Sequence, residues 1–236
     1  MIEFKNLIKK YGENTVLNIP ELIIPKGQSF GLVGNNGAGK TTMFNLILDL
    51  ISPTKGYVMI NGVRVDKSED WKYSTSAYLD ESFLIGYLFP EEYFLMLGSL
   101  RGWQKQDVVD FIKDFNELFN GEIIGVKKYI RDLSKGNQKK VGVVGALIGD
   151  PEFILLDEPF ANLDPTTQIR LKKLLRKTVQ DDQKTVLISS HNLNHITEVT
   201  ERIVVLDKGN MEMDIVTNEK TLKELEDFFT VENIER

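Results

Sequence analysis

The residues best suited to chemistry form a glycine-rich segment at positions 34–41, which reads Gly-Asn-Asn-Gly-Ala-Gly-Lys-Thr. Its spacing matches the phosphate-binding pattern G-x-x-x-x-G-K-[ST], known as the P-loop, and it lies between an expected strand at 29–33 and an expected helix from Thr41 to Asp49. In such a loop the backbone N–H groups turn toward a phosphate, and the helix N-terminus adds its positive dipole end. An ordinary glycine-rich turn is the alternative, and the flanking strand and helix argue against it.

Two side chains of this segment have distinct expected roles. Lys40 should pair with the β- and γ-phosphates of a nucleotide, and the Thr41 hydroxyl should bind Mg²⁺. The residues expected to hold the phosphates are Asn35, Gly37, Ala38, Gly39, Lys40, Thr41 and Thr42.

A pair of acids follows a second buried strand. Four apolar residues at 153–156 lead directly into Asp157 and Glu158. This pattern delivers carboxylates to the C-terminal edge of a sheet, where ligands collect in α/β folds. We expect Asp157 to belong to the Mg²⁺ shell and Glu158 to polarise an attacking water. By itself the pair would be read as a solvated loop; the glycine-rich segment favours the catalytic interpretation.

The remaining pattern indicates an α/β fold with two additions. Short alternating runs before Val33 predict an N-terminal antiparallel β subdomain, and residues 57–65 predict a hairpin. Helical periodicity over 83–133 predicts an inserted α-helical subdomain. Beyond it, apolar runs at 153–156 and 185–189 flank an expected helix at 166–179, as in parallel strands with crossovers. The chain is therefore expected to be one domain, 1–236, with a nucleotide-binding core at 1–82 and 150–236 and the helical insertion at 83–149.

The composition limits the kinds of partner that the chain is expected to bind. The 236 residues carry 29 Lys and Arg against 35 Asp and Glu, a net charge of −6, and no long basic run, so nucleic acid is not an expected partner. There is no cysteine, so neither disulfides nor a cysteine-based metal site is possible within the chain. No segment approaches the roughly 20 apolar residues of a membrane-spanning helix, and no signal peptide is visible. Any membrane role is expected to depend on a partner.

These motifs together resemble the nucleotide-binding domain of ABC ATPases, over nearly the whole chain. The diagnostic element is Leu133-Ser134-Lys135-Gly136-Asn137-Gln138, which resembles the ABC signature Leu-Ser-Gly-Gly-Gln and precedes an expected helix running to Gly149. The resemblance implies that Ser134 and Gly136 contact the γ-phosphate held by the opposite subunit of a dimer. A serine N-cap beside a glycine is the structural alternative.

Three further positions take their expected roles from this resemblance. Tyr11 would stack on adenine, although a loop tyrosine can also pack on its own neighbours. Asp164 would couple the two sites of the dimer. His191, which follows a predicted strand, would bridge the γ-phosphate and Glu158, whereas His195 is interpreted as a surface or internally satisfied residue.

The chain also departs from the family pattern. Glu81 stands where the family usually has a glutamine; a carboxylate can still reach Mg²⁺ or its water, and it should hold the metal more strongly than an amide. In the signature, Lys135 replaces a glycine and Asn137 stands at the usual glutamine. The apolar stretch 83–89 would form the groove for a coupling helix of a membrane subunit, with burial inside the helical subdomain as the alternative.

The resemblance implies an ATPase that closes as a homodimer or heterodimer around two ATP molecules and Mg²⁺. It would drive a separate transmembrane permease subunit from the cytoplasmic face of the cell membrane, and the short C-terminal region favours export. One alternative is a soluble ABC ATPase that serves iron–sulfur cluster assembly; another is an unrelated P-loop kinase. The transported substrate would be defined by the membrane subunit.

Overall fold

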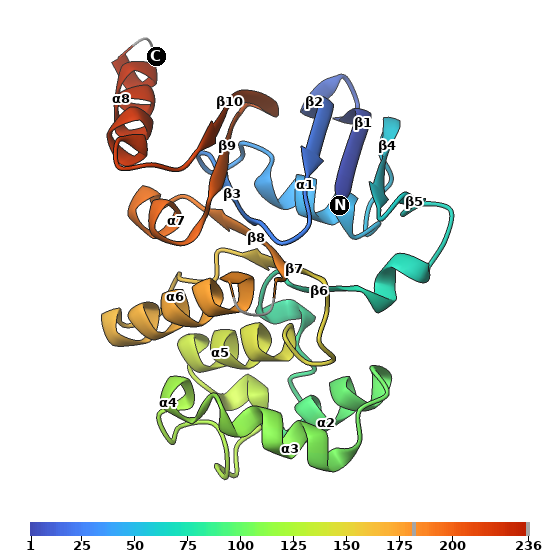
Figure 1. The fold of residues 1–236 in the computed structure, drawn as a ribbon, viewed down its shortest axis with the longest axis vertical. Helices are drawn as coiled ribbons and strands as arrows, with labels where there is room; N and C mark the ends of the chain where they lie inside the picture. Colours follow the sequence, from blue (N-terminus) through green and yellow to red (C-terminus); the bar gives the residue numbers. More distant parts are fainter. Residues whose placement is uncertain (181–182, 235–236) are drawn as a thin grey trace.

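One curled sheet organises the molecule, with helices on both of its faces (Figure 1). The structure, a computed structural model, describes residues 1–180 and 183–234. The expected core segment 150–236 therefore includes positions 181–182 and 235–236, which lie outside the described residues. Across the described chain the sheet has ten strands in the order β5-β4-β1-β2-β10-β9-β3-β8-β7-β6. The α/β fold class is confirmed.

The first half of the sheet is antiparallel, as the alternating N-terminal runs predicted. Strands β1 (Ile2–Tyr11) and β2 (Asn14–Ile24) pair antiparallel. On the other side of β1 lies β4 (Lys55–Ile60), which turns into β5 (Val63–Arg64). Asn61 and Gly62 both have positive φ, 53° and 79°, which is the geometry of a two-residue hairpin turn. The predicted hairpin is therefore present.

The second half contains the parallel strands that position the chemistry. It consists of β3 (Ser29–Val33), β6 (Thr75–Tyr78), β7 (Phe153–Asp157), β8 (Thr185–Ser190), β9 (Arg202–Asp207) and β10 (Asn210–Val216). Strand β3 pairs in parallel with both β8 and β9, and β7 pairs in parallel with β8 and β6. Strand β7 is buried on both faces: Phe153 and Leu155 belong to one apolar cluster, and Ile154 and Leu156 to the other. This two-sided burial explains its continuous apolar run.

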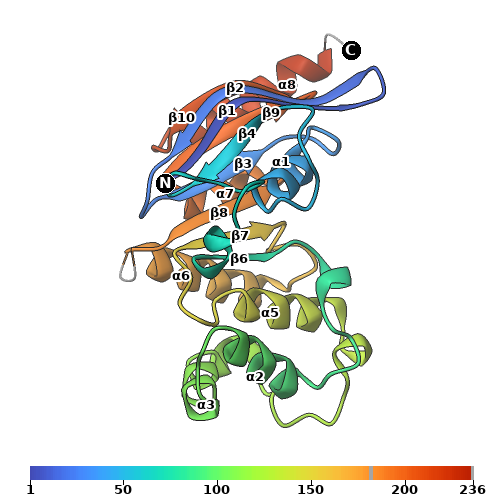
Figure 2. The same ribbon diagram turned by 90° about the vertical axis from the view of Figure 1, so that its right-hand side faces the viewer.

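Helices close both faces of the sheet. Helix α1 (Lys40–Ile47) buries Met43, Phe44 and Ile47 in the same cluster as the N-terminal strands, inside the curl of the sheet (Figure 2). The opposite face is covered by α5 (Lys135–Gly145), α6 (Pro165–Gln180) and α7 (Leu193–Val199). Helix α8 (Thr221–Ile234) lies beside α7 at the C-terminal end.

The segment expected to be a helical insertion contains helices only. After the 3₁₀ turns η1 (Asp70–Tyr73) and η2 (Glu81–Phe83) come α2 (Pro90–Leu100), α3 (Lys105–Lys113), α4 (Asn116–Phe119) and η3 (Ile130–Asp132). These helices lie at the end of the molecule opposite the antiparallel strands (Figure 1). Their core includes Val108, Ile112, Phe115 and Phe119, which follow the helical spacing of three and four, whereas Leu100, which fits the same periodicity, is exposed. Helix α5 ends at Gly145, not at the expected Gly149, which has a positive φ of 85° that a helix does not continue.

Candidate active site

The phosphate-binding loop, the acidic pair and His191 meet where three adjacent parallel strands end. The glycine-rich loop follows β3, the acidic pair closes β7, and His191 follows β8. In the register of the sheet Val33 is opposite Ser190, and Asp157 is opposite Ser189. Because the carboxyl ends of parallel strands share one edge, segments more than 100 residues apart in sequence are brought together there.

The loop between β3 and α1 depends on a glycine at its end. Gly39 is the N-cap of α1 and has a φ of 109°, a conformation that L side chains rarely adopt. A Cβ at this position would lie 3.0 Å from the carbonyl oxygen of Val16, so the loop also approaches β2 too closely for a side chain. The first turn of α1 then places Lys40 and Thr41 side by side at the helix N-terminus.

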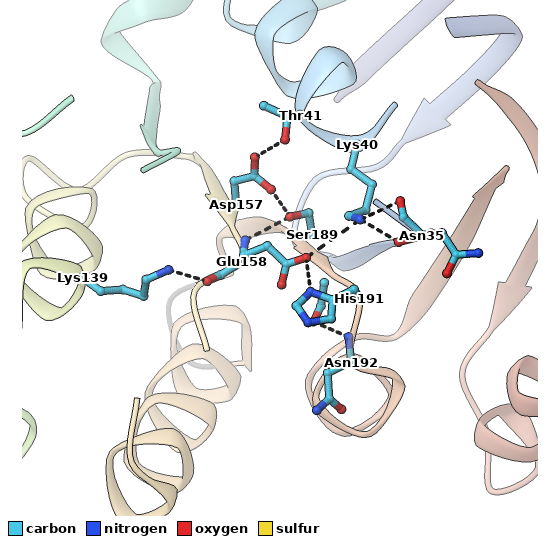
Figure 3. Close-up of polar contacts among 11 residues, drawn as sticks. Asn35, Lys40, Thr41, Lys139, Asp157, Glu158, Ser189, His191 and Asn192 are labelled. Atoms are coloured by element: carbon cyan, nitrogen blue, oxygen red, sulfur yellow. Dashed lines mark hydrogen bonds and ion pairs between the residues drawn. The ribbon is translucent and has the colours of Figure 1, made fainter. Parts of the chain in front are cut away.

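Lys40 is buried and bound to the loop that it follows. Its Nζ donates to the carbonyl oxygens of Gly34 at 2.6 Å and Asn35 at 3.3 Å, and it lies 3.9 Å from Glu158 Oε1 (Figure 3). Burial lowers the pKa of the Lys40 ammonium, while the carboxylates of Glu158 and Asp157 oppose that shift. A lysine held in this way presents its charge at the mouth of the loop, where a phosphate would bind.

Asp157 connects the loop to the centre of the sheet. Its Oδ2 accepts a hydrogen bond from the Thr41 hydroxyl at 2.7 Å, and its Oδ1 accepts one from the Ser189 hydroxyl. Within residues 1–180 and 183–234 no group of three or more His, Cys, Asp or Glu side chains could hold a metal by itself. A hydroxyl and one carboxylate suit Mg²⁺, which keeps several waters and takes further oxygens from substrate phosphates. The donor set therefore fits Mg²⁺ bound together with a nucleotide.

Glu158 is held by its backbone and by a histidine. It has a φ of 48°, unusual for a non-glycine residue, and its N–H donates to Ser189 Oγ at 3.0 Å. Its side-chain Oε1 lies 2.8 Å from Nδ1 of His191. The Glu158 side chain is 26% exposed and that of His191 is 58% exposed, so both remain accessible to a ligand or water.

A pocket of about 450 Å³ lies among these residues. Ser189 and His191 are not part of its lining, which consists of Val16, Asn36, Gly37, Ala38, Gly39, Lys40, Thr41, Thr42, Leu79, Asp80, Lys139, Asp157 and Glu158. The pocket thus brings together most of the residues expected from the glycine-rich segment and both acids. A slightly larger hollow of about 500 Å³ lies beside α3, α4 and α6 and contains none of the expected site residues.

Other expected site residues do not line this pocket. Tyr11 is 56% exposed near the turn between β1 and β2, with the Lys9 ammonium 4.7 Å from the centre of its ring. Ser134 caps α5 and accepts a hydrogen bond from the Asn137 N–H at 3.2 Å. Gly136 lies against the loop after β7, where a Cβ would be 2.9 Å from the carbonyl oxygen of Asn162. Glu81 begins η2, close to Lys139. The roles expected of these residues remain predictions.

Sequence reasoning missed two residues of the site: Lys139, which lines the pocket, and Ser189, which does not line it but contacts Asp157 and the Glu158 N–H. Ser189 was taken only as a strand end, although a hydroxyl beside an acid in the neighbouring strand could have suggested a contact. Nothing in the local sequence marks Lys139 as a site residue, because its reach into the pocket depends on how α5 packs against β6 and the end of β7.

A set of parallel strands with a phosphate-binding loop at its carboxyl edge, a carboxylate pair and a histidine defines a P-loop nucleotide-binding protein. A family model described as ABC transporter matches residues 17–161. With the relatives described next, this match shows that the chain belongs to the ABC transporter ATP-binding family. The family binds ATP with Mg²⁺ and hydrolyses ATP, so the chain is an ATPase.

Curated relatives carry transport names. The bacitracin transport ATP-binding protein BcrA of Enterococcus faecalis is 33% identical over 224 residues, covering 93% of this chain and 70% of that protein. The uncharacterized ABC transporter ATP-binding protein YhaQ of Bacillus subtilis is 34% identical, with 89% and 69% covered. The methionine import ATP-binding protein MetN of Carboxydothermus hydrogenoformans is 31% identical, with 92% and 67% covered. These names do not favour the iron–sulfur alternative.

A solved structure has the same fold and was determined in a state that follows ATP hydrolysis. A dimeric ATP-binding cassette in a post-hydrolysis state, bound to ADP and Pi, superposes with a TM-score of 0.82 at 26% identity, covering 92% of this chain and 99% of that one. Among the described residues, no helix combines the length and apolar character that crossing a membrane requires.

Proposed function

We propose that two ATPase subunits, either two copies of this chain or this chain and a related one, close head to tail around two ATP molecules and Mg²⁺ to drive a separate membrane-spanning subunit. Each site would combine Lys40, Thr41, Asp157 and Glu158 of one chain with Ser134 and Gly136 of the other. The observation that carries the proposal is the position of Ser134 and Gly136, which do not line the pocket of their own chain. A site that uses them needs a second subunit.

Each residue has a defined task in this site. Lys40 and the backbone N–H groups at the start of α1 would bind the phosphates, and Thr41 and Asp157 would hold Mg²⁺, whose charge would offset that of the transferred phosphoryl group. Glu158 accepts a proton from the attacking water. His191 holds the Glu158 carboxylate through the contact of 2.8 Å and keeps it directed at that water. Tyr11 provides an aromatic face for adenine.

The transport part of the proposal rests on the family and on one surface. Phe83, Ile85 and Tyr87 are 55%, 43% and 73% exposed directly after Glu81, whereas Leu84 and Leu88 pack into the core. Three exposed apolar side chains beside the nucleotide site suit contact with a membrane subunit, which would place the protein at the cytoplasmic face of the cell membrane. Because the relatives include a methionine import protein, family membership supports transport without fixing its direction. We keep export as the direction to test.

The composite site can be tested with a hydrolysis-deficient variant. Glu158→Gln removes the proton acceptor and should lower kcat by about 10²- to 10⁴-fold while ATP still binds. In the presence of MgATP this variant should accumulate as a dimer in size-exclusion chromatography with light scattering. Adding Ser134→Glu should return it to a monomer, because a carboxylate would then face the γ-phosphate across the interface. A Glu158→Gln protein that stays monomeric at saturating MgATP contradicts the two-chain site.

The identity of the partner separates transport from the soluble alternative. A polytopic membrane protein that co-purifies with the chain supports a transporter, whereas a soluble scaffold protein supports cluster assembly. The reconstituted complex can then be tested for ATP-dependent movement of substrate out of or into vesicles, which decides between export and import.

A further inference from the structure

A second lysine reaches the nucleotide pocket from outside the strand ends. Lys139 lies on α5, five residues after the cap Ser134, and is only 5% exposed. It lines the same pocket as Lys40, and Figure 3 shows it extending from α5 toward the chain just after Asp157. A lysine is rarely buried without partners, so its contacts indicate what it does.

The first contact is with the backbone of Glu158. Lys139 Nζ donates to the Glu158 carbonyl oxygen at 2.8 Å, while the Glu158 N–H donates to Ser189 Oγ at 3.0 Å. Glu158 has a φ of 48°, a strained conformation for a non-glycine residue that persists only where the surroundings hold it. Lys139 and Ser189 therefore fix both backbone polar groups of this strained residue and, with them, the direction of its side chain.

The second contact is with Glu81. Lys139 Nζ lies 4.0 Å from Glu81 Oε1, and their side chains are 6% and 20% exposed. Asp80, Asp157 and Glu158 contribute further negative charge around the same ammonium. If Lys139 were lost, Lys40 would be left to offset the negative charge of these carboxylates and of the ATP phosphates without help from the second lysine. An unpaired charge in such a site is costly, whereas two neutral side chains avoid the cost.

We propose that Lys139 is a positioning residue for ATP hydrolysis: it fixes the backbone of Glu158, and its charge compensates the carboxylate of Glu81, so that Glu81 can occupy a position next to the catalytic acids. Lys139 also lies on the helix that Ser134 caps and whose first turn includes Gly136. The contact therefore connects the signature helix with Glu158 within one chain.

A double-mutant cycle of Lys139→Gln and Glu81→Gln tests the pairing. Lys139→Gln should lower kcat by about 10- to 100-fold, in the range found when a residue that orients a catalytic group is lost. Adding Glu81→Gln should regain roughly tenfold, because the double variant no longer has an uncompensated carboxylate. The Kd for a fluorescent ATP analogue should change less than kcat in Lys139→Gln, a split that a general loss of structure would not produce.

Lys172→Gln is the matched control. Lys172 is also a buried lysine, 9% exposed, and its Nζ lies 2.8 Å from Glu198 Oε1 outside the pocket. This variant loses an ion pair of the same kind and should keep the wild-type kcat. If Lys139→Gln behaves like Lys172→Gln, or if the effects of Lys139→Gln and Glu81→Gln simply multiply, the proposal is wrong.

Stability gives a second readout. If Lys139→Gln unfolds at too low a temperature for kinetics, the double variant decides: a melting temperature restored by Glu81→Gln supports the charge pair, and a double variant as unstable as the single one overturns it. The inference rests on the role proposed for Glu158. Glu158→Gln is therefore assayed in parallel, and wild-type kcat in that variant would refute the proposed function whatever Lys139 does.

Discussion

In the proposed function, the contact between Glu158 and His191 would control the rate of hydrolysis. The Nδ1 of His191 lies 2.8 Å from Glu158 Oε1, and the glutamate backbone is fixed independently by Ser189 and Lys139. The imidazole at 2.8 Å is therefore a closer restraint on the carboxylate than the Lys40 ammonium at 3.9 Å. A side chain directed in advance at the attacking water avoids a reorganisation cost during the reaction.

Replacing His191 should therefore impair turnover more than binding. We expect His191→Ala to lower kcat by about 10- to 100-fold, because Glu158 loses the partner that orients it. The Kd for ATP should change little, since the loop and Lys40 are untouched. Steady-state ATPase assays and fluorescent nucleotide binding measure the two quantities. His195→Ala is the control, because its ring packs against Phe160 at 5.1 Å between centroids and not against Glu158; equal losses in both variants would refute the orienting role.

His195 should make stability depend on pH. Burial, followed by the nearby Lys172, holds the pKa of His195 below its ordinary value of 6.5, and its Nδ1 has no hydrogen-bond partner in the described part of the chain. In the unfolded chain, His195 therefore binds a proton near pH 6.5, whereas in the folded chain it does so only at a lower pH. The contribution of His195 is complete above this pH and is lost as the pH falls toward the lowered pKa.

The role of His195 can be measured as the urea concentration at the midpoint of unfolding, at about pH 7.5 and at about pH 5.5. The wild-type midpoint should fall at the lower pH, and His195→Gln should show a smaller fall. His191→Gln serves as the comparison, since that histidine is exposed. An identical fall in wild type and His195→Gln would show that His195 does not contribute.

Among the elements, those with a strong local pattern could be predicted and those that depend on packing could not. Strand β3 has the bounds that its buried apolar run predicted, and the turn at Asn61 and Gly62 followed from its residue types. Lys139 could not be placed, because its distance to Glu158 depends on how α5 packs on β6 and β7. The positive φ of Glu158 was also invisible, since no glycine marks it.

The packing of α5 on the sheet depends on a glycine that can be tested. A Cβ at Gly142 would lie 2.1 Å from two ring carbons of Tyr78 at the end of β6. Gly142→Ala should therefore push α5 away from the sheet and lower the free energy of unfolding by about 1–3 kcal/mol, as measured by urea denaturation. Because the same helix carries Lys139, kcat should fall as well.

The comparison variant for Gly142→Ala is Tyr78→Leu, which removes the outer part of the ring. In a Tyr78→Leu background, Gly142→Ala should destabilise the protein less than it does in the wild type, since the two changes act on one contact. Additive effects would show that the clash with Tyr78 is not the cause.

At the scale of the whole molecule, the nucleotide pocket and the exposed apolar stretch are connected through one short segment. Asp80 lines the pocket, Glu81 approaches Lys139, and Phe83 is exposed two residues further on. A change in what the pocket holds can therefore reach the outer surface over a few residues. Such a connection would allow nucleotide binding and partner binding to influence each other, as reciprocal coupling requires.

Tyr87→Glu tests whether this surface binds the proposed membrane subunit. Because Tyr87 is 73% exposed, the substitution should leave the fold and the ATPase rate of the isolated chain unchanged. It replaces a ring that lies 4.4 Å from the guanidinium carbon of Arg131. Binding to the membrane subunit should weaken roughly tenfold or more, because an aromatic anchor at an interface contributes about 2 kcal/mol or more. The measurement is the amount of subunit that co-purifies, together with ATP-driven transport in vesicles. Val216→Glu, on β10 and also 73% exposed, is the matched control and should bind normally; equal binding by both variants would place the partner elsewhere on the molecule.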